Sequence, residues 1–162
     1  MSSHSLYREA GVLKAIAYVD GASRGNPGPS GYGVYMRTEH GEIIEVAGYL
    51  GTTTNNVAEY SGLLEAMSVA TAEGATELDV VSDSLLLVKQ MNGEYRVKHP
   101  NLIPLFQRAR TMARGFRRFS IRHTLRAGNK EADRLANVAV DRADGRWENR
   151  KRPPMPPNGG GD

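Results

Sequence analysis

Four carboxylates lie where the chain changes from one predicted element of secondary structure to the next. Asp20 ends an apolar run just before a glycine-rich turn, and Glu59 lies in the first turns of a long helical pattern. Asp83 follows a short apolar run, and Asp133 lies near the start of the last helical pattern. Ligand sites of α/β proteins collect at such positions. Buried carboxylates are costly unless they are paired or bound to a metal ion, so four that converge would require a cation.

The donor types indicate which metal could bind. Carboxylate oxygens with open coordination positions suit Mg²⁺ or Mn²⁺. The chain has no cysteine, and its histidines, at 4, 40, 99 and 123, lack the spacing of a zinc site. Taken singly, Asp83 and Asp133 could be acids that the helix dipole favours, and Asp20 a turn residue. Together the four acids predict metal-dependent phosphodiester cleavage, in which two ions about 4 Å apart clamp the attacking and leaving oxygens.

The charge is unevenly distributed along the 162 residues. Residues 1–88 hold 4 basic and 11 acidic side chains, a net charge of −7, whereas residues 89–134 hold 12 and 3, a net charge of +9. A basic segment in a folded domain indicates a polyanionic partner, although a solvated basic helix face has the same composition. Acids that hold cations beside arginines that hold phosphates are what a metal-dependent nuclease needs.

The apolar patterning predicts an α/β protein with the element order β-β-β-α-β-α-α-β-α. Three strands with short connections favour an antiparallel meander, and the alternation that follows indicates a mixed sheet flanked by helices. The predicted strands cover 14–20, 32–37, 42–50, 78–82 and 119–125, and the predicted helices cover 55–72, 83–91, 102–115 and 130–142. A turn dense in glycine and proline spans 21–31.

Four segments that contain these acids together resemble the type 1 ribonuclease H family. They are YVDGASRGNPGPSG at 18–31, TNNVAEYSGLLEAM at 54–67, VVSDS at 80–84 and NKEADRLAN at 129–137. The segments occur in order over about 14–140, and each one contains one of the acids. The resemblance implies the ribonuclease H fold, with a five-stranded mixed sheet of three antiparallel strands followed by parallel strands.

The resemblance also implies an activity and its metal. Asp20, Glu59, Asp83 and Asp133 would be the metal-binding catalytic carboxylates, holding two Mg²⁺ ions, for which Mn²⁺ could substitute. The implied reaction is endonucleolytic hydrolysis of the RNA strand of RNA–DNA hybrids, leaving 5′-phosphate and 3′-hydroxyl ends. Double-stranded RNA is a possible additional substrate. The alternatives are another nuclease of the same fold, or a non-catalytic nucleic-acid-binding module, which would not need four acids.

Substrate contacts are expected around two turns and a basic segment. Small residues in the glycine-rich turn would let a nucleic-acid backbone approach, and the resemblance implies that this turn contacts the RNA strand. One of the polar residues before Glu59 should cap the helix, and the others could contact the hybrid. The candidate substrate-binding residues are Gly21, Ala22, Ser23, Asn26, Thr54, Asn55, Asn56, Lys89 and Lys98.

Arg126 is the fifth catalytic candidate. Many members of the family have a histidine in a loop before the last acid, but here Arg126 is in that loop and His123 is in the preceding strand pattern. The sequence therefore resembles the archaeal-type branch, in which arginine replaces that histidine. Arginine cannot act as a general base near neutral pH, but it can hold a phosphate. We expect Arg126 to be catalytic and His123 to be structural.

The expected organisation is a single domain over 14–143. Residues 1–13 are expected to form a flexible arm, and 144–162, rich in proline, glycine and arginine, a disordered tail. The long basic handle of some family members is absent between 91 and 102, so arginines of 108–122 would have to help grip the substrate. No run of residues could span a membrane and no secretion signal is evident, so a cytoplasmic monomer without a membrane partner is expected.

Overall fold

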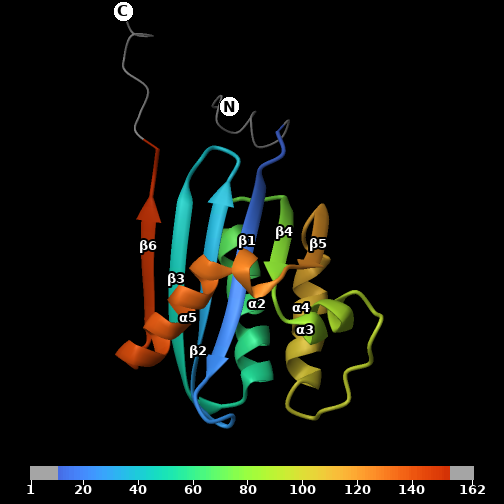
Figure 1. Ribbon diagram of the computed structural model, residues 1–162. Helices are drawn as coiled ribbons and strands as arrows, with labels where there is room; N and C mark the ends of the chain where they lie inside the picture. Colours follow the sequence, from blue (N-terminus) through green and yellow to red (C-terminus); the bar gives the residue numbers. More distant parts are fainter. Residues whose placement is uncertain (1–10, 154–162) are drawn as a thin grey trace, which may run out of the picture.

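The computed structural model describes residues 11–153, and these form a mixed six-stranded sheet with helices on both faces (Figure 1). The strands are β1 (Lys14–Ser23), β2 (Gly28–Thr38), β3 (Ile43–Thr53), β4 (Glu77–Ser82), β5 (Arg118–His123) and β6 (Arg146–Lys151). The helices are α2 (Asn55–Ala72), α3 (Leu85–Met91), α4 (Ile103–Ala113) and α5 (Lys130–Arg142), with a short 3₁₀ turn at Arg126–Gly128.

The strand order is β5-β4-β1-β2-β3-β6. The chain first forms the antiparallel meander β1–β2–β3, and β4 and β5 then add in parallel beside β1. The predicted fold class and the antiparallel meander are therefore confirmed. The glycine-rich turn is shorter than predicted, because β1 continues to Ser23 and β2 already begins at Gly28.

Two layers of helices cover the sheet. Helix α5 crosses one face, over β1, β2 and β3, while α2 packs on the opposite face against β1 and β2 and also contacts α3 and α4 (Figure 1). The main core lies between the sheet and α2, and residues such as Val19, Val34, Leu63 and Met67 are fully buried there. A smaller cluster lies between the sheet and α5. No helix within residues 11–153 is long and apolar enough to cross a membrane.

Helix ends follow their local sequence signals. The hydroxyl of Thr54 accepts a hydrogen bond from the backbone N–H of Val57, and the hydroxyl of Ser84 does the same for Leu87, so each caps the start of its helix. The predicted capping of α2 by a residue of this group is thus confirmed. Helix α5 has the predicted limits, and Glu131 and Asp133 lie in its first turn, where the helix dipole stabilises acidic side chains.

The predicted tail and the predicted strand number were wrong. Residues 146–151 form β6, which pairs antiparallel with β3 and makes the sheet six-stranded instead of five-stranded. Within the predicted arm, the backbone carbonyl of Leu13 accepts hydrogen bonds from the N–H groups of Thr76 and Glu77, which attach this residue to the body of the fold. The rest of the arm, 1–10, and the end of the tail, 154–162, lie outside the described residues.

Candidate active site

Three of the four predicted acids meet at the carboxyl ends of two parallel strands. Asp20 lies on β1, Asp83 directly follows β4, and Glu59 comes from the first turns of α2. One carboxylate oxygen from each of the three lies within 4.8 Å of the others. Asp133, on the first turn of α5, lines the same cleft as these three acids. Residues more than a hundred positions apart thus form one carboxylate cluster.

Two glycines make this convergence possible. A Cβ atom on Gly21 would lie 2.4 Å from the backbone nitrogen of Glu59, and one on Gly33 would lie 2.3 Å from the carbonyl oxygen of Ala132. Gly33 is the register partner of Asp20 on β2. The missing side chains let α2 and α5 approach the strands closely. Gly21 is packed against α2 and also lines the cleft beside the acids, so the contact with a nucleic-acid backbone that the sequence suggested stays a prediction.

The cluster is electrostatically unfavourable without a cation. Burial, then the charge of Asp83 and the hydrogen bond and charge of Asp133, raise the pKa of Asp20 from 3.8 to about 8, although the Gly21 N–H lowers it. Burial, followed by the charges of Asp20 and Asp83, also raises the pKa of Glu59 well above its usual value. Within residues 11–153 no ion pair involves any of the four acids.

The donor set fits a hard divalent cation. All four side chains offer carboxylate oxygens, which Mg²⁺ and Mn²⁺ prefer. Glu59 is 4% exposed, and its Oε2 is buried without a hydrogen-bond partner among the described residues. A buried acceptor of this kind is costly unless something binds it. The chemistry of the acids and this free oxygen therefore both match a cation site.

An open cleft of about 580 Å³ surrounds the acids, and we call it the carboxylate cleft. It is lined by the four acids and by Gly21, Ala22, Ser23, Arg24, Asn55, Ser84, His123, Thr124, Leu125, Arg126 and Asn137. Of the predicted substrate-binding residues, the structure therefore brings Gly21, Ala22, Ser23 and Asn55 to the acids. Asn26 lies next to them, since its Oδ1 accepts a hydrogen bond from the Asn55 backbone N–H at 2.9 Å.

Arg126 and His123 both line this cleft, and both are exposed. His123 is a strand residue, as expected, but it is the last residue of β5 and lines the cleft, so its structural role stays a prediction. Arg126, in the 3₁₀ turn, is also free of ion pairs within the described residues.

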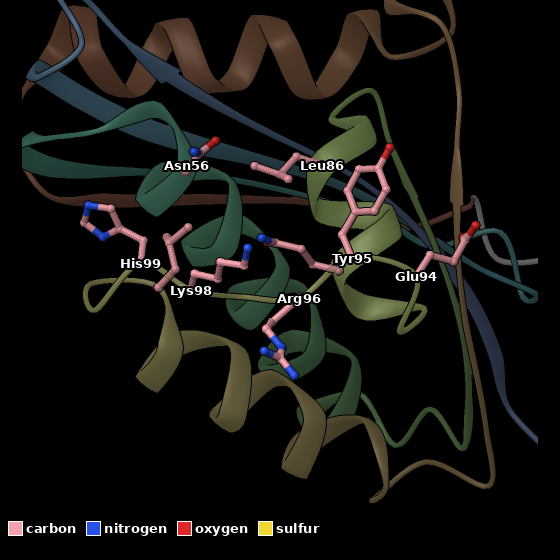
Figure 2. Close-up of a pocket in the computed structure, with 9 residues that line it drawn as sticks. Asn56, Leu86, Glu94, Tyr95, Arg96, Lys98 and His99 are labelled. Atoms are coloured by element: carbon pink, nitrogen blue, oxygen red, sulfur yellow. The ribbon is translucent and has the colours of Figure 1, made fainter.

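The remaining substrate-side candidates lie outside the carboxylate cleft. Asn56 and Lys98 line a second cleft of about 500 Å³ between α2, α3 and the segment that leads to α4. Figure 2 shows Leu86 and Tyr95 on one side of this second cleft and His99 at its other end. Lys89 lines neither cleft, because its ammonium group is held 3.4 Å from Glu94 and lies over the Tyr95 ring.

Asn129 is a residue of the site that sequence reasoning missed. Its side chain is 1% exposed, and its Nδ2 donates to the carbonyl oxygen of Val19 at 2.8 Å. Val19 precedes Asp20, and the Asn129 carbonyl accepts from the Asp133 N–H at 3.1 Å. Asn129 thus ties the start of α5 to β1 between two of the acids. Its position before a helix was a visible signal, but it also suits an ordinary helix start.

The arginines of 96–152 fall into two groups. Those of 134–152 all form ion pairs: Arg134, Arg142, Arg146, Arg150 and Arg152. Within the described residues, none of the basic side chains from Arg96 to Lys130 forms one, and no acid occurs between Glu94 and Glu131. The part of the basic segment from Arg96 to Lys130 is therefore not neutralised by the fold and remains available to an anionic partner.

Comparison with known proteins identifies related sequences. A family profile described as "Reverse transcriptase-like" matches residues 18–139. A bifunctional protein of Mycobacterium tuberculosis is 47% identical over 133 residues, which cover 81% of this chain and 36% of that protein. Ribonuclease HI of Halobacterium salinarum is 42% identical, over 78% of this chain and 64% of the relative. A ribonuclease H of Verminephrobacter eiseniae is 34% identical, over 80% of this chain and 92% of the relative. The chain thus spans about a third of the length of the first of these relatives.

Solved structures agree with the sequence comparison. The crystal structure of RNase H1 from Halobacterium salinarum has a TM-score of 0.76 and 41% identity, and the match covers 80% of this chain and 98% of that one. LC11-RNase H1, solved in complex with an RNA/DNA hybrid, has a TM-score of 0.74 and 39% identity, and the match covers 80% of this chain and 98% of that one. At these identities the likeness extends beyond the fold.

Proposed function

The chain belongs to the type 1 ribonuclease H family, and on this premise we propose that it cleaves the RNA strand of RNA–DNA hybrids by metal-dependent hydrolysis. The observation that carries the proposal is the carboxylate cluster, in which Asp20, Glu59 and Asp83 meet within 4.8 Å and Asp133 lines the same cleft. The related LC11-RNase H1 was solved with an RNA/DNA hybrid, which supports the same substrate class here.

Asp20, Glu59, Asp83 and Asp133 would together hold two Mg²⁺ ions, or Mn²⁺ in their place. When bound, such ions supply the charge that clamps the attacking and leaving oxygens of an in-line phosphoryl displacement. Hydrolysis of this kind gives 5′-phosphate and 3′-hydroxyl ends.

The remaining residues of the cleft would bind and orient the RNA strand. Ser23 and Asn55 offer hydroxyl and amide groups at the cleft wall, and such groups can recognise the 2′-hydroxyl that distinguishes RNA from DNA. Arg126 is exposed beside the acids. Its planar guanidinium stays charged at neutral pH and suits a phosphate, so we propose that it stabilises charge at the scissile phosphate.

Grip on the duplex would come from the unpaired basic segment. Lys98 and Asn56 line the second cleft, and the unpaired arginines of 108–122 would contact phosphates further out. Lys89 is a weaker candidate because Glu94 already holds it. Phosphate contacts release counterions, so such binding weakens as salt rises. The monomeric state and the cytoplasmic location stay predictions.

One experiment tests the proposal directly. Labelled RNA–DNA hybrid, double-stranded RNA and double-stranded DNA are each incubated with the protein in Mg²⁺, in Mn²⁺ and in chelator. We expect cleavage of the RNA strand of the hybrid, with 3′-hydroxyl ends, only when metal is present. Activity on double-stranded RNA would extend the substrate range, whereas cleavage in chelator, or none on the hybrid, would contradict the proposal.

A further inference from the structure

The strand β6 lies beyond residue 139, where the family match ends. It is the outer strand beside β3, at the sheet edge opposite to β5 (Figure 1). Alternate residues of a strand face opposite sides of the sheet. One set of β6 side chains therefore faces α5 and the other faces the side of α2. Asp133 lies in α5 and Glu59 lies in α2, so β6 packs beside the two helices that hold two of the four acids.

Towards α5, the side chain of Trp147 packs in the smaller hydrophobic cluster. This cluster contains Ala47, which is the register partner of Trp147 on β3, together with Leu135 and Ala139 of α5. Leu135 is fully buried and lies two residues after Asp133. A large ring packed against this cluster restricts how the helix can rotate or tilt, because cores are close-packed.

A buried carboxylate makes a second link between β6 and α5. Glu45 of β3 is 4% exposed and accepts from Arg134 at 2.5 Å and from the side-chain amide of Asn149 at 3.3 Å. Arg134 directly follows Asp133. Glu45 is buried and Arg134 about half exposed, so loss of either partner would leave this carboxylate less well compensated. The first turns of α5 are thus fixed to the β3–β6 edge by packing and by charge.

On the other face, β6 is joined to α2 by two ion pairs. Arg146 pairs with Glu65 at 2.8 Å, and Arg150 pairs with Glu73 at 2.6 Å. Glu65 also accepts a hydrogen bond from the Tyr32 hydroxyl at 2.5 Å, which connects the same helix to β2. Glu65 lies six residues after Glu59 in α2. The strand therefore connects both helices that bring acids to the cluster.

We propose that β6 is a positioning element of the carboxylate site. Through Trp147 and Asn149 it sets where α5 holds Asp133, and through Arg146 and Arg150 it sets where α2 holds Glu59. Metal sites tolerate only small changes in ligand distance, and a displacement of about 1 Å at a reacting centre can cost about 100-fold in rate. The inference rests on the proposed function, because it concerns the geometry of the same four acids.

The test uses Trp147→Ala in the full chain, with Trp147→Phe as the conservative variant. Phe116→Leu is the matched control, since Phe116 is 9% exposed in the core beside α4 and distant in the sheet from β6. For each protein, Tm, Mg²⁺ affinity by calorimetry, and kcat and KM on hybrid are measured at a temperature where circular dichroism shows all of them folded.

We expect Trp147→Ala to lower kcat by about 10- to 100-fold and to weaken Mg²⁺ binding. KM should stay within about threefold, since no phosphate contact is removed, and Trp147→Phe should recover most of the loss. Phe116→Leu should lower Tm without changing kcat. If Trp147→Ala does not fold, Asn149→Ala keeps the Trp147 packing and should show smaller losses of kcat and Mg²⁺ affinity, again with little change in KM.

The outcomes separate this inference from the proposed function. If the wild-type protein does not cleave hybrid, the proposed function is wrong. If the wild type cleaves hybrid, but the folded Trp147→Ala or Asn149→Ala variant keeps full kcat and Mg²⁺ affinity at a lowered Tm, β6 contributes stability alone and the inference is overturned. A kcat loss in Phe116→Leu equal to that of Trp147→Ala would overturn it as well.

Discussion

Replacing Asp20 with asparagine should make the metal-free protein more stable while removing its activity. The substitution keeps the size of the side chain and an oxygen that can accept the Gly21 N–H at 3.0 Å. It removes the negative charge of Asp20, which repels the nearby charges of Glu59, Asp83 and Asp133. The new amide can also donate to a neighbouring carboxylate, so the repulsion is replaced by a hydrogen bond.

The pKa of Asp20 gives the size and sign of the effect. Because the folded pKa of about 8 lies above the ordinary value of 3.8, the unfolded chain loses this proton first, and the wild type loses stability as pH rises from about 4 to 8. Four pKa units set an upper bound of roughly 6 kcal/mol. The proton is shared between Asp20 and Glu59, and water in the open cleft screens the repulsion. We therefore expect a stabilisation of about 2–4 kcal/mol instead of the upper bound. For this chain length that is a Tm gain of roughly 5–15 °C.

The assay is thermal unfolding followed by circular dichroism, in chelator, at pH 4.5 and pH 8. We expect the Tm of Asp20→Asn to exceed that of the wild type at pH 8 and the difference to shrink at pH 4.5. Added Mg²⁺ should raise the Tm of the wild type far more than that of the variant. Asp144→Asn, at an acid that is 59% exposed beside Arg142, is the control and should show no such dependence. A Tm difference that does not change with pH would refute the argument from carboxylate repulsion.

Further predictions concern catalysis, binding and the position of the acids. Arg126→Ala should lower kcat by roughly 10- to 1000-fold, with partial recovery in Arg126→Lys, whereas His123→Ala should keep the pH–rate profile; a large loss in a stably folded His123→Ala with Arg126→Ala near wild type would reverse these roles. The Kd of the inactive Asp20→Asn variant for hybrid should rise steeply with salt, and a constant Kd in fluorescence anisotropy would exclude the basic segment as the grip. Asn129→Ala should weaken Mg²⁺ binding in calorimetry and lower Tm, because α5 loses its bond to β1; unchanged Mg²⁺ affinity would show that Asn129 does not position Asp133.

Much of the site could be predicted because its signals are local. The acids Asp20, Glu59, Asp83 and Asp133 are recognisable from a few neighbouring residues each, and their approach follows from the rule that sites form at the carboxyl ends of parallel strands. The limits of α5 were predicted correctly for the same reason, since apolar spacing and the acids of its first turn lie within the helix itself.

Other features could not be predicted, because each depends on a partner far away in the sequence. The run RWENRK at 146–151 has no strong strand pattern, and it becomes a strand because β3, about a hundred residues earlier, offers a free edge and buried partners for Trp147 and Asn149. His123 enters the cleft only because β5 ends beside β4.

The residue types and their order along the chain were sufficient to identify the family, the four acids that meet in the cleft and the α/β class, since short-range patterns of polarity and charge encode these. The sixth strand, the bond from Asn129 to the Val19 carbonyl, and the close approach of two helices over Gly21 and Gly33 arise from packing in three dimensions. The physical reason is that the free energy of a strand edge, a buried amide or a missing Cβ depends on the groups placed opposite it, and the folded chain alone brings those groups together.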